Sequence, residues 1–297
     1  MIYSLIKTII LLMSHIPLPV GQFVGKMLGA AFGMLPLNRA TVSLENIQKS
    51  FSIGIGDAKR LNRRVLSHFG QMLFEVPLIM RLDIRNIDKY VVFVNGENLI
   101  GALGKGKGAF ILTGHFGNWE LMAAATALQY GPGAAVVRPI DFQPLDRLMD
   151  ELRSRFGTEI IPKKKSMRRV ISAIKGNRMV GILLDQNVDW YEGVFVNFFG
   201  RWACTNKGLA LVALKTGTPV IPVFSVRRRD GRYNIIFENE VQLIETGDKT
   251  RDVEENTALF TGIIEKYIKR YPDHWFWFHK RWKTRPYCRL PETRNNT

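Results

Sequence analysis

His115 and Glu120 are the two side chains whose types and spacing are best suited to chemistry. They lie in the octapeptide Gly114–Leu121, which reads Gly-His-Phe-Gly-Asn-Trp-Glu-Leu. With His115 in a glycine-flanked turn and Glu120 in the first turn of a helix, we expect the carboxylate to swing back and hold the imidazole. An imidazole that a carboxylate keeps in one tautomer is a general base.

The same two residues also fit an ordinary structural role. A histidine can pack in a turn, and acidic side chains are favoured near helix N-termini. The flanking residues favour chemistry, because Gly114 and Gly117 allow close backbone approach and Asn118 adds an amide beside the candidate base. Asn118 and the backbone amides at the helix start are therefore candidate donors to an oxyanion.

Polar residues follow two other predicted strands, and we expect them at the same edge of the sheet. Arg138 follows the apolar run Ala134–Val137 and can clamp a phosphate with two hydrogen bonds, although a surface ion pair to Asp141 is the plainer alternative. Asp185 and Gln186 follow another apolar run, and ligands of open α/β sheets bind at the carboxyl ends of strands. A simple loop start is the alternative for these two.

Thr205 and Lys207 form a further candidate anion site. Thr205 is expected to cap a helix that begins near Asn206, where Lys207 adds positive charge. Capping alone is the simpler explanation.

The elements that position these residues alternate between strands and helices, which predicts an α/β fold with a mostly parallel sheet flanked by helices. Asp230-Gly231 predicts a hairpin turn and an antiparallel edge strand after it. The predicted strands are Val91–Val94, Phe110–Thr113, Ala134–Val137, Ile160-Ile161, Met179–Leu184, Val220–Val226 and Tyr233–Phe237. The predicted helices are Arg60–Met80, Leu99–Leu103, Leu121–Leu128, Pro144–Phe156, Met167–Lys175, Lys207–Leu214 and Val253–Arg270.

Composition limits the class of partner. The chain has 297 residues, of which 42 are basic and 26 acidic, so its formal net charge is +16 at pH 7. Such an excess favours nucleic acid, an acidic protein or an anionic membrane surface. No zinc-finger, homeodomain or RNP pattern accompanies the charge, so we do not expect nucleic acid as a partner.

Sequence signatures of other chemistries are absent. No Gly-x-Ser-x-Gly elbow occurs, which argues against a serine acyl-enzyme, and no His-Glu-x-x-His helix supports a metal site. Cys204 and Cys288 fit no Cys-x-x-Cys spacing. We therefore expect no metal, and a reduced protein that faces the cytoplasm.

The N-terminal region is apolar but interrupted. Ile2–Val20 contains Lys7 and two prolines, and Gly21–Leu37 contains Lys26. Neither is the clean apolar stretch of about 20 residues that a spanning helix needs, and no convincing signal-peptide cleavage site follows. We expect residues 1–37 to form two short membrane-associating helices in one leaflet, and residues 38–297 to form one α/β domain. A soluble helical hairpin covering the core is the alternative.

Four segments in order resemble one family over nearly the whole chain. Gly114–Leu121 resembles the His-x-x-x-x-Asp/Glu motif of the glycerolipid acyltransferase superfamily, and Val137-Arg138-Pro139 resembles an Arg-Pro motif. Phe198–Gly208 resembles a Phe-Phe-Gly…Ala-x-Thr…Gly stretch, and Trp275–Pro286 resembles an aromatic-basic C-terminal signature. Together they are most similar to the late acyltransferases of lipid A biosynthesis, the lauroyl and myristoyl transferases.

The resemblance implies a glycerolipid-acyltransferase-like fold and a membrane-bound acyl transfer. The fatty acyl group would move from an acyl carrier protein or other thioester, which brings its own phosphopantetheine, to a hydroxyl of an anionic lipid A precursor. The reaction would take place at the cytoplasmic face of a bacterial inner membrane and need no cofactor. His115 would be the general base and Glu120 its orienting partner. The segment 194–201 would line an acyl slot, with core packing as an equal alternative.

The C-terminal run Trp275–Arg285 interleaves aromatic and basic residues. We expect its tryptophans in the core and its charges at a membrane surface.

Three other functions remain open. The same chemistry can act on another glycolipid, an ornithine lipid or a lysophospholipid. The protein can instead be a lipid hydrolase, or a non-enzymatic basic protein of the membrane surface.

Overall fold

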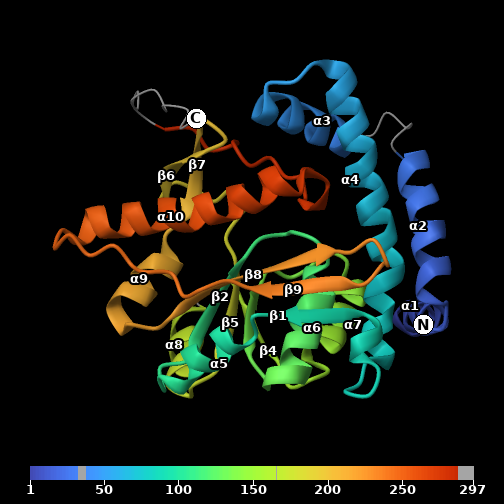
Figure 1. Ribbon diagram of the computed structural model, residues 1–297, viewed down its shortest axis with the longest axis horizontal. Helices are drawn as coiled ribbons and strands as arrows, with labels where there is room; N and C mark the ends of the chain where they lie inside the picture. The colour runs from blue at the N-terminus through green and yellow to red at the C-terminus, as the bar shows by residue number, and fades with distance from the viewer. Residues whose placement is uncertain (33–37, 165, 287–297) are drawn as a thin grey trace.

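A seven-stranded sheet forms the centre of the protein, and helices lie on both sides of it (Figure 1). The computed structural model describes residues 1–32, 38–164 and 166–286. The strands follow the order β1-β9-β8-β2-β5-β3-β4, and all neighbours are parallel except β8 and β9. They are β1 Val91–Val94, β2 Ala109–Thr113, β3 Ala134–Val137, β4 Glu159–Pro162, β5 Met179–Leu183, β8 Val220–Arg227 and β9 Tyr233–Phe237.

The helices fall close to the ranges that the apolar periodicity predicts. The α-helices are α1 Ile2–Met13, α2 Leu18–Phe32, α3 Asn38–Phe51, α4 Ile55–Glu75, α5 Glu97–Gly104, α6 Trp119–Tyr130, α7 Gln143–Ser154, α8 Met167–Lys175, α9 Gly208–Thr216 and α10 Lys249–Arg270. Short 3₁₀ helices cover Val76–Arg81, Ile87–Lys89 and Pro272–His274. The α/β class and the mostly parallel sheet are therefore confirmed.

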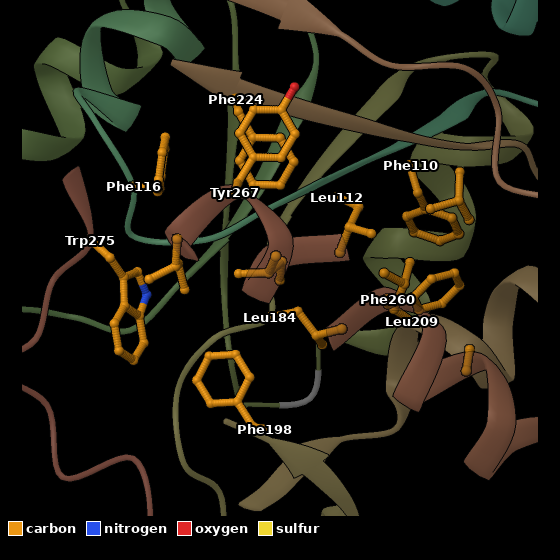
Figure 2. Packing of buried hydrophobic residues seen from close by; sticks show 14 of the residues in the cluster. Phe110, Leu112, Phe116, Leu184, Phe198, Leu209, Phe224, Phe260, Tyr267 and Trp275 are labelled. Atoms are coloured by element: carbon orange, nitrogen blue, oxygen red, sulfur yellow. The ribbon is translucent and has the colours of Figure 1, made fainter. Parts of the chain in front are cut away.

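The two faces of the sheet carry separate hydrophobic cores, because successive side chains of a strand point to opposite faces. Phe110 and Leu112 of β2 belong to the cluster that includes Phe260 of α10, and Figure 2 shows the three side chains together. Ala109 and Ile111 belong to the other cluster, with α5 and α6. Strand β2 is thus buried on both sides, as expected for a central parallel strand.

One sequence prediction about strands is wrong, and one pair of strands has no counterpart in the prediction. Strand β9 pairs antiparallel with β8, as predicted, but it is not the edge, because β1 pairs parallel with its other side. A second, two-stranded sheet of β6 Gly193–Phe198 and β7 Arg201–Asn206 was not predicted. Strand β6 overlaps the segment expected to line an acyl slot, and β7 contains Thr205, which was expected to cap a helix.

The N-terminal helices leave most of their apolar side chains exposed. No residue of α1 is buried, and the buried residues of α2 are glycines. Among the described residues, no single helix is long and apolar enough to cross a membrane, but α1 and α2 together meet the length and composition needed, with a bend of 117° between them. The exposed apolar side chains include Leu5, Leu12, Phe23, Met27 and Phe32.

Helix α2 is held against α4 by close backbone contact at glycines. A Cβ atom added to Gly29 would lie 2.1 Å from the carbonyl oxygen of Leu66, and one added to Gly25 would lie 2.4 Å from that of Gly70. These spaces admit no side chain, so α2 lies on α4 at a fixed register.

The C-terminal segment after α10 is buried more deeply than its charge suggests. Trp277 and Arg281 are both 0% exposed, and burial lowers the pKa of Arg281 to about 10. Arg281 donates hydrogen bonds to the carbonyl oxygens of Gln186, at 3.2 Å, and Cys204, at 2.8 Å. The tryptophans are in the core as expected, whereas the expectation of membrane contact is wrong for Arg281. Lys280, Lys283 and Arg285 are exposed.

We expect Gly29→Ala to lower the free energy of unfolding by about 1–3 kcal/mol, because an added methyl group forces two backbones apart. Thermal unfolding in detergent measures this. Gly262→Ala is the matched control, since a Cβ atom there meets nothing within 4 Å and alanine favours a helix by about 0.5–1 kcal/mol. Equal stability of Gly29→Ala and wild type would contradict the docking of α2 described above.

His279 predicts a specific pH dependence of stability. Burial lowers its pKa to about 4 from the ordinary 6.5, and its Nε2 accepts a hydrogen bond from the backbone N–H of Asn187 at 2.9 Å. Between these two pH values the unfolded chain binds a proton that the folded chain does not, so stability falls as pH falls from 6.5 to 4.

The free energy of unfolding, measured with denaturant at several pH values in that window, should depend less steeply on pH for His279→Gln than for wild type. The two slopes are expected to differ by up to about 1.4 kcal/mol per pH unit, which corresponds to the uptake of about one proton on unfolding. Identical slopes would mean that His279 does not remain neutral in the folded protein.

Candidate active site

His115 lies in a tight turn between β2 and α6 that only glycine can complete. Gly117 has φ +59°, and a Cβ atom there would lie 1.8 Å from the carbonyl oxygen of Ser225. The C-terminal segment pairs with this turn: Gly117 N–H donates to the His274 carbonyl at 2.8 Å, and Phe276 N–H donates to the His115 carbonyl at 3.0 Å. The turn is therefore fixed on both sides of His115.

The carboxylate of Asp185 holds the imidazole. Nδ1 of His115 lies 2.8 Å from Oδ1, and the backbone N–H of His115 donates to Oδ2 at 2.8 Å. The indole N–H of Trp275 donates to the same Oδ2 at 2.6 Å. Burial raises the pKa of Asp185, but the charge of His115 and these hydrogen bonds outweigh it and lower the pKa to about 2.

The pair leaves one nitrogen of His115 available for chemistry. An ionised Asp185 accepts the Nδ1 proton, so the lone pair of the imidazole lies on Nε2. The side chain of His115 is 24% exposed and that of Asp185 only 2%. The amide nitrogen of Gln186 lies 3.2 Å from Nε2. Asp185 thus fixes the tautomer of the imidazole, an arrangement that suits a general base.

The structure corrects the prediction that Glu120 holds the imidazole. Glu120 accepts two hydrogen bonds from Arg153, at 2.9 and 2.6 Å, and one from the indole N–H of Trp119 at 3.1 Å. Its carboxylate is therefore directed toward α7, and Asp185 takes the place expected for it. Asp185 was predicted as a substrate-binding residue, and Arg153 and Trp275 were not singled out for the site.

An aromatic wall stands beside His115, formed by Phe69 of α4, Trp119 of α6, and Phe276 and Phe278 of the C-terminal segment. The ring centroid of His115 lies 5.1 Å from that of Trp119 and 6.2 Å from that of Phe276. Phe69 lies 5.4 Å from Phe276 and 5.8 Å from Phe278. Phe69, Trp119 and Phe276 are only half-buried, so apolar surface is available next to the base.

Asn118 faces the protein interior and not a substrate, so its prediction as an oxyanion donor is wrong. It is 0% exposed. Its Oδ1 accepts from the backbone N–H of Leu121 at 3.0 Å, which caps α6, and its Nδ2 donates to Glu75 at 3.2 Å. Both polar atoms of the amide are thus occupied.

Arg138 is exposed and follows β3, whose parallel neighbour β5 precedes Asp185. The topology therefore brings it to the sheet edge that carries His115, as predicted. In the described part of the chain it forms no ion pair, and the alternative pair with Asp141 is not made.

Thr205 and Lys207 do not form the predicted cap. Thr205 lies in β7, is 0% exposed, and its Oγ1 accepts a hydrogen bond from Arg281. The side chain of Asn206 instead accepts from the backbone N–H of Gly208 at 2.8 Å, and Lys207 is the N-cap residue without a capping side chain. The prediction of an anion site on Thr205 is wrong, because that hydroxyl is enclosed with a buried guanidinium.

Two of the phenylalanines in the segment expected to line an acyl slot belong to the core instead. Phe198 is 0% and Phe199 is 7% exposed. The ring centroid of Phe198 lies 5.5 Å from that of Trp275 (Figure 2). The alternative of core packing is therefore confirmed for these two residues.

Comparison with known proteins identifies the family. A family model described as bacterial lipid A biosynthesis acyltransferase matches residues 1–284. The chain is 25% identical to the lipid A biosynthesis lauroyltransferase of Escherichia coli (strain K12) over 278 residues, which are 93% of this chain and 89% of that protein. It is 24% identical to the lipid A biosynthesis palmitoleoyltransferase of the same strain, over 92% of this chain and 88% of that protein.

A relative with a different named acceptor is also similar. The phosphatidylinositol mannoside acyltransferase of Mycolicibacterium smegmatis is 23% identical over 226 residues, which are 75% of this chain and 72% of that protein. Because the family model covers the sheet, the His115 turn and the C-terminal segment alike, the chain belongs to the bacterial lipid A biosynthesis acyltransferase family of enzymes.

Proposed function

We propose that the protein transfers a fatty acyl group from the thioester of acyl carrier protein to a hydroxyl of a lipid A precursor. The observation that carries the proposal is the His115–Asp185 pair, which leaves the lone pair of His115 on Nε2, beside the aromatic wall. Family membership supports the acyl donor and lipid acceptor as classes. The net charge of +16 favours both an acidic carrier protein and an anionic acceptor.

The geometry supports a direct transfer between the two substrates. Nε2 of His115 takes the proton of the acceptor hydroxyl as its oxygen attacks the thioester carbonyl carbon. The carbon–sulfur bond then breaks, and the leaving thiolate takes up the proton. The negative charge of Asp185 stabilises the imidazolium that forms between these steps. A carboxylate has this role in other histidine–carboxylate pairs that act as a general base.

The aromatic wall supplies the apolar surface that an acyl chain needs. Phe69, Trp119 and Phe276 lie next to the base and are half-buried. Glu120 would keep this wall in place, because it accepts a hydrogen bond from the indole of Trp119 and is itself held by Arg153. The exposed Arg138 contacts a phosphate of the acceptor or of the phosphopantetheine arm, and Gln186 contacts the substrate near Nε2.

Another glycolipid is the second candidate acceptor. The similarity to a phosphatidylinositol mannoside acyltransferase favours it, since that relative matches 75% of this chain. The two acceptors share a sugar headgroup and a hydroxyl nucleophile, so the same base serves both.

We place the protein on the cytoplasmic face of a bacterial inner membrane, with residues 1–37 as its membrane-associating segment and 38–297 as the acyltransferase domain. Helices α1 and α2 expose apolar side chains such as Leu12 and Phe23. With a bend of 117° between them, the two helices fit one leaflet, with their apolar surface in the acyl region.

His115→Ala and Asp185→Asn should each lower acyl transfer by about 10²-fold or more, because the first removes the base and the second its tautomer and charge. The assay uses labelled acyl carrier protein with a lipid A precursor, a phosphoglycolipid, a lysophospholipid or no acceptor. Asp189→Asn is the matched control, since Asp189 is exposed and hydrogen-bonded to Tyr191.

Label that appears only as free fatty acid would identify a hydrolase. Transfer that survives His115→Ala would contradict the mechanism, and transfer to the phosphoglycolipid alone would select the second acceptor. No acyl chemistry with any substrate would favour a non-enzymatic membrane protein.

Leu12→Glu and Phe23→Glu should reduce co-flotation of the protein with anionic vesicles, because each places a charge in the acyl region. Ile100→Glu is the control, as Ile100 is 60% exposed but lies on α5. Equal flotation of all three variants and wild type would exclude α1 and α2 as the membrane contact.

A further inference from the structure

Glu75 is a buried carboxylate that joins four elements of the protein. It ends α4, is 0% exposed, and accepts hydrogen bonds from Gln22 of α2, Arg227 of β8, Tyr233 of β9 and Asn118 before α6. The distances are 2.8 Å from Gln22 Nε2, 2.8 Å from the Tyr233 hydroxyl, and 3.2 Å from Asn118 Nδ2. We call these five residues the Glu75 hub. A buried charge is tolerated only when it is paired and hydrogen-bonded in this way.

One end of the hub is the N-terminal helix pair. The amide nitrogen of Gln22 donates both to Glu75 and to the carbonyl oxygen of Gly231 at 2.7 Å. The glycine contacts between α2 and α4 place Gln22 at a fixed position relative to Glu75. The buried positions of α2 are glycines, so Gln22 is the side chain through which α2 reaches Glu75.

The other end of the hub is the catalytic turn. Asn118 follows His115 by three positions, and its side chain both caps α6 and donates to Glu75. The backbone N–H of Arg227 donates to Nε2 of His274 at 3.1 Å, and the carbonyl oxygen of His274 accepts from Gly117. The hub therefore holds the turn through Asn118 on one side and through His274 on the other.

We infer that the Glu75 hub is a positioning device that couples the N-terminal helix α2 to the general base. Gln22 and Asn118 bind the same carboxylate, so the placement of α2 sets the placement of the turn that carries His115. Helix α2 then has two roles, membrane contact on its exposed side and alignment of the base on its inner side. The inference rests on the proposed acyl transfer, which provides one of its two readouts.

The first test compares Gln22→Leu with Gln71→Leu in detergent micelles, where membrane attachment does not limit activity. Both glutamines are half-buried, but within the described part of the chain Gln71 donates only to the Ser67 carbonyl of its own helix. Gln22→Leu should lower kcat about tenfold with the KM for the acyl donor unchanged, because misplacement of a base lowers the rate of the chemical step. Gln71→Leu should match wild type.

The second readout does not depend on any substrate. Hydrogen exchange of the peptide 114–121 should be faster in Gln22→Leu than in wild type or Gln71→Leu, because the turn loses one of its fixed supports. Kinetics and exchange that are unchanged in Gln22→Leu would overturn the inference. If wild type shows no transfer while exchange responds as expected, the proposed function fails and the coupling remains.

Discussion

The Asp185 carboxylate joins three parts of the chain that are distant in sequence. It follows β5, binds the side chain and backbone of His115 after β2, and accepts the indole N–H of Trp275 from the C-terminal segment. Because β2 and β5 are parallel neighbours, their carboxyl ends meet, and the sheet itself brings His115 and Asp185 together. The remaining features of the site surround this contact: the turn at Gly117, the aromatic wall and the buried Arg281.

Two buried charged side chains, Arg281 and Glu75, hold together segments most of which are not joined by the hydrogen bonds of a sheet or helix. Arg281 binds the carbonyl oxygens of Gln186 and Cys204, and Glu75 binds side chains from α2, β8, β9 and the turn before α6. A buried ion that lost its partners would be costly, so each such group selects one arrangement of the segments around it. Removing a single partner therefore affects the geometry of the site as well as stability.

Local patterns predicted the sheet well and the site less well, for a physical reason. Apolar runs such as Ala134–Val137 and Tyr233–Phe237 coincide with strands, because burial on a sheet demands such runs. The partner of His115 depends on which strands are neighbours, which short-range spacing does not encode. Glu120 lies near His115 in sequence, yet Arg153 takes its carboxylate. The β6–β7 hairpin was missed because its polar and aromatic residues lack a simple alternation.

The pairing of residues 274–276 with the His115 turn has a consequence for the order of events during synthesis. The N-terminal helices and α4 emerge from the ribosome first, and domains fold as their chain becomes available. The turn that carries His115 stays without its C-terminal partner until nearly all of the described chain has been made. In the function that we propose, a nascent chain would therefore reach a lipid surface through α1 and α2 before His115 is aligned, and it would become active only after translation of the final aromatic segment.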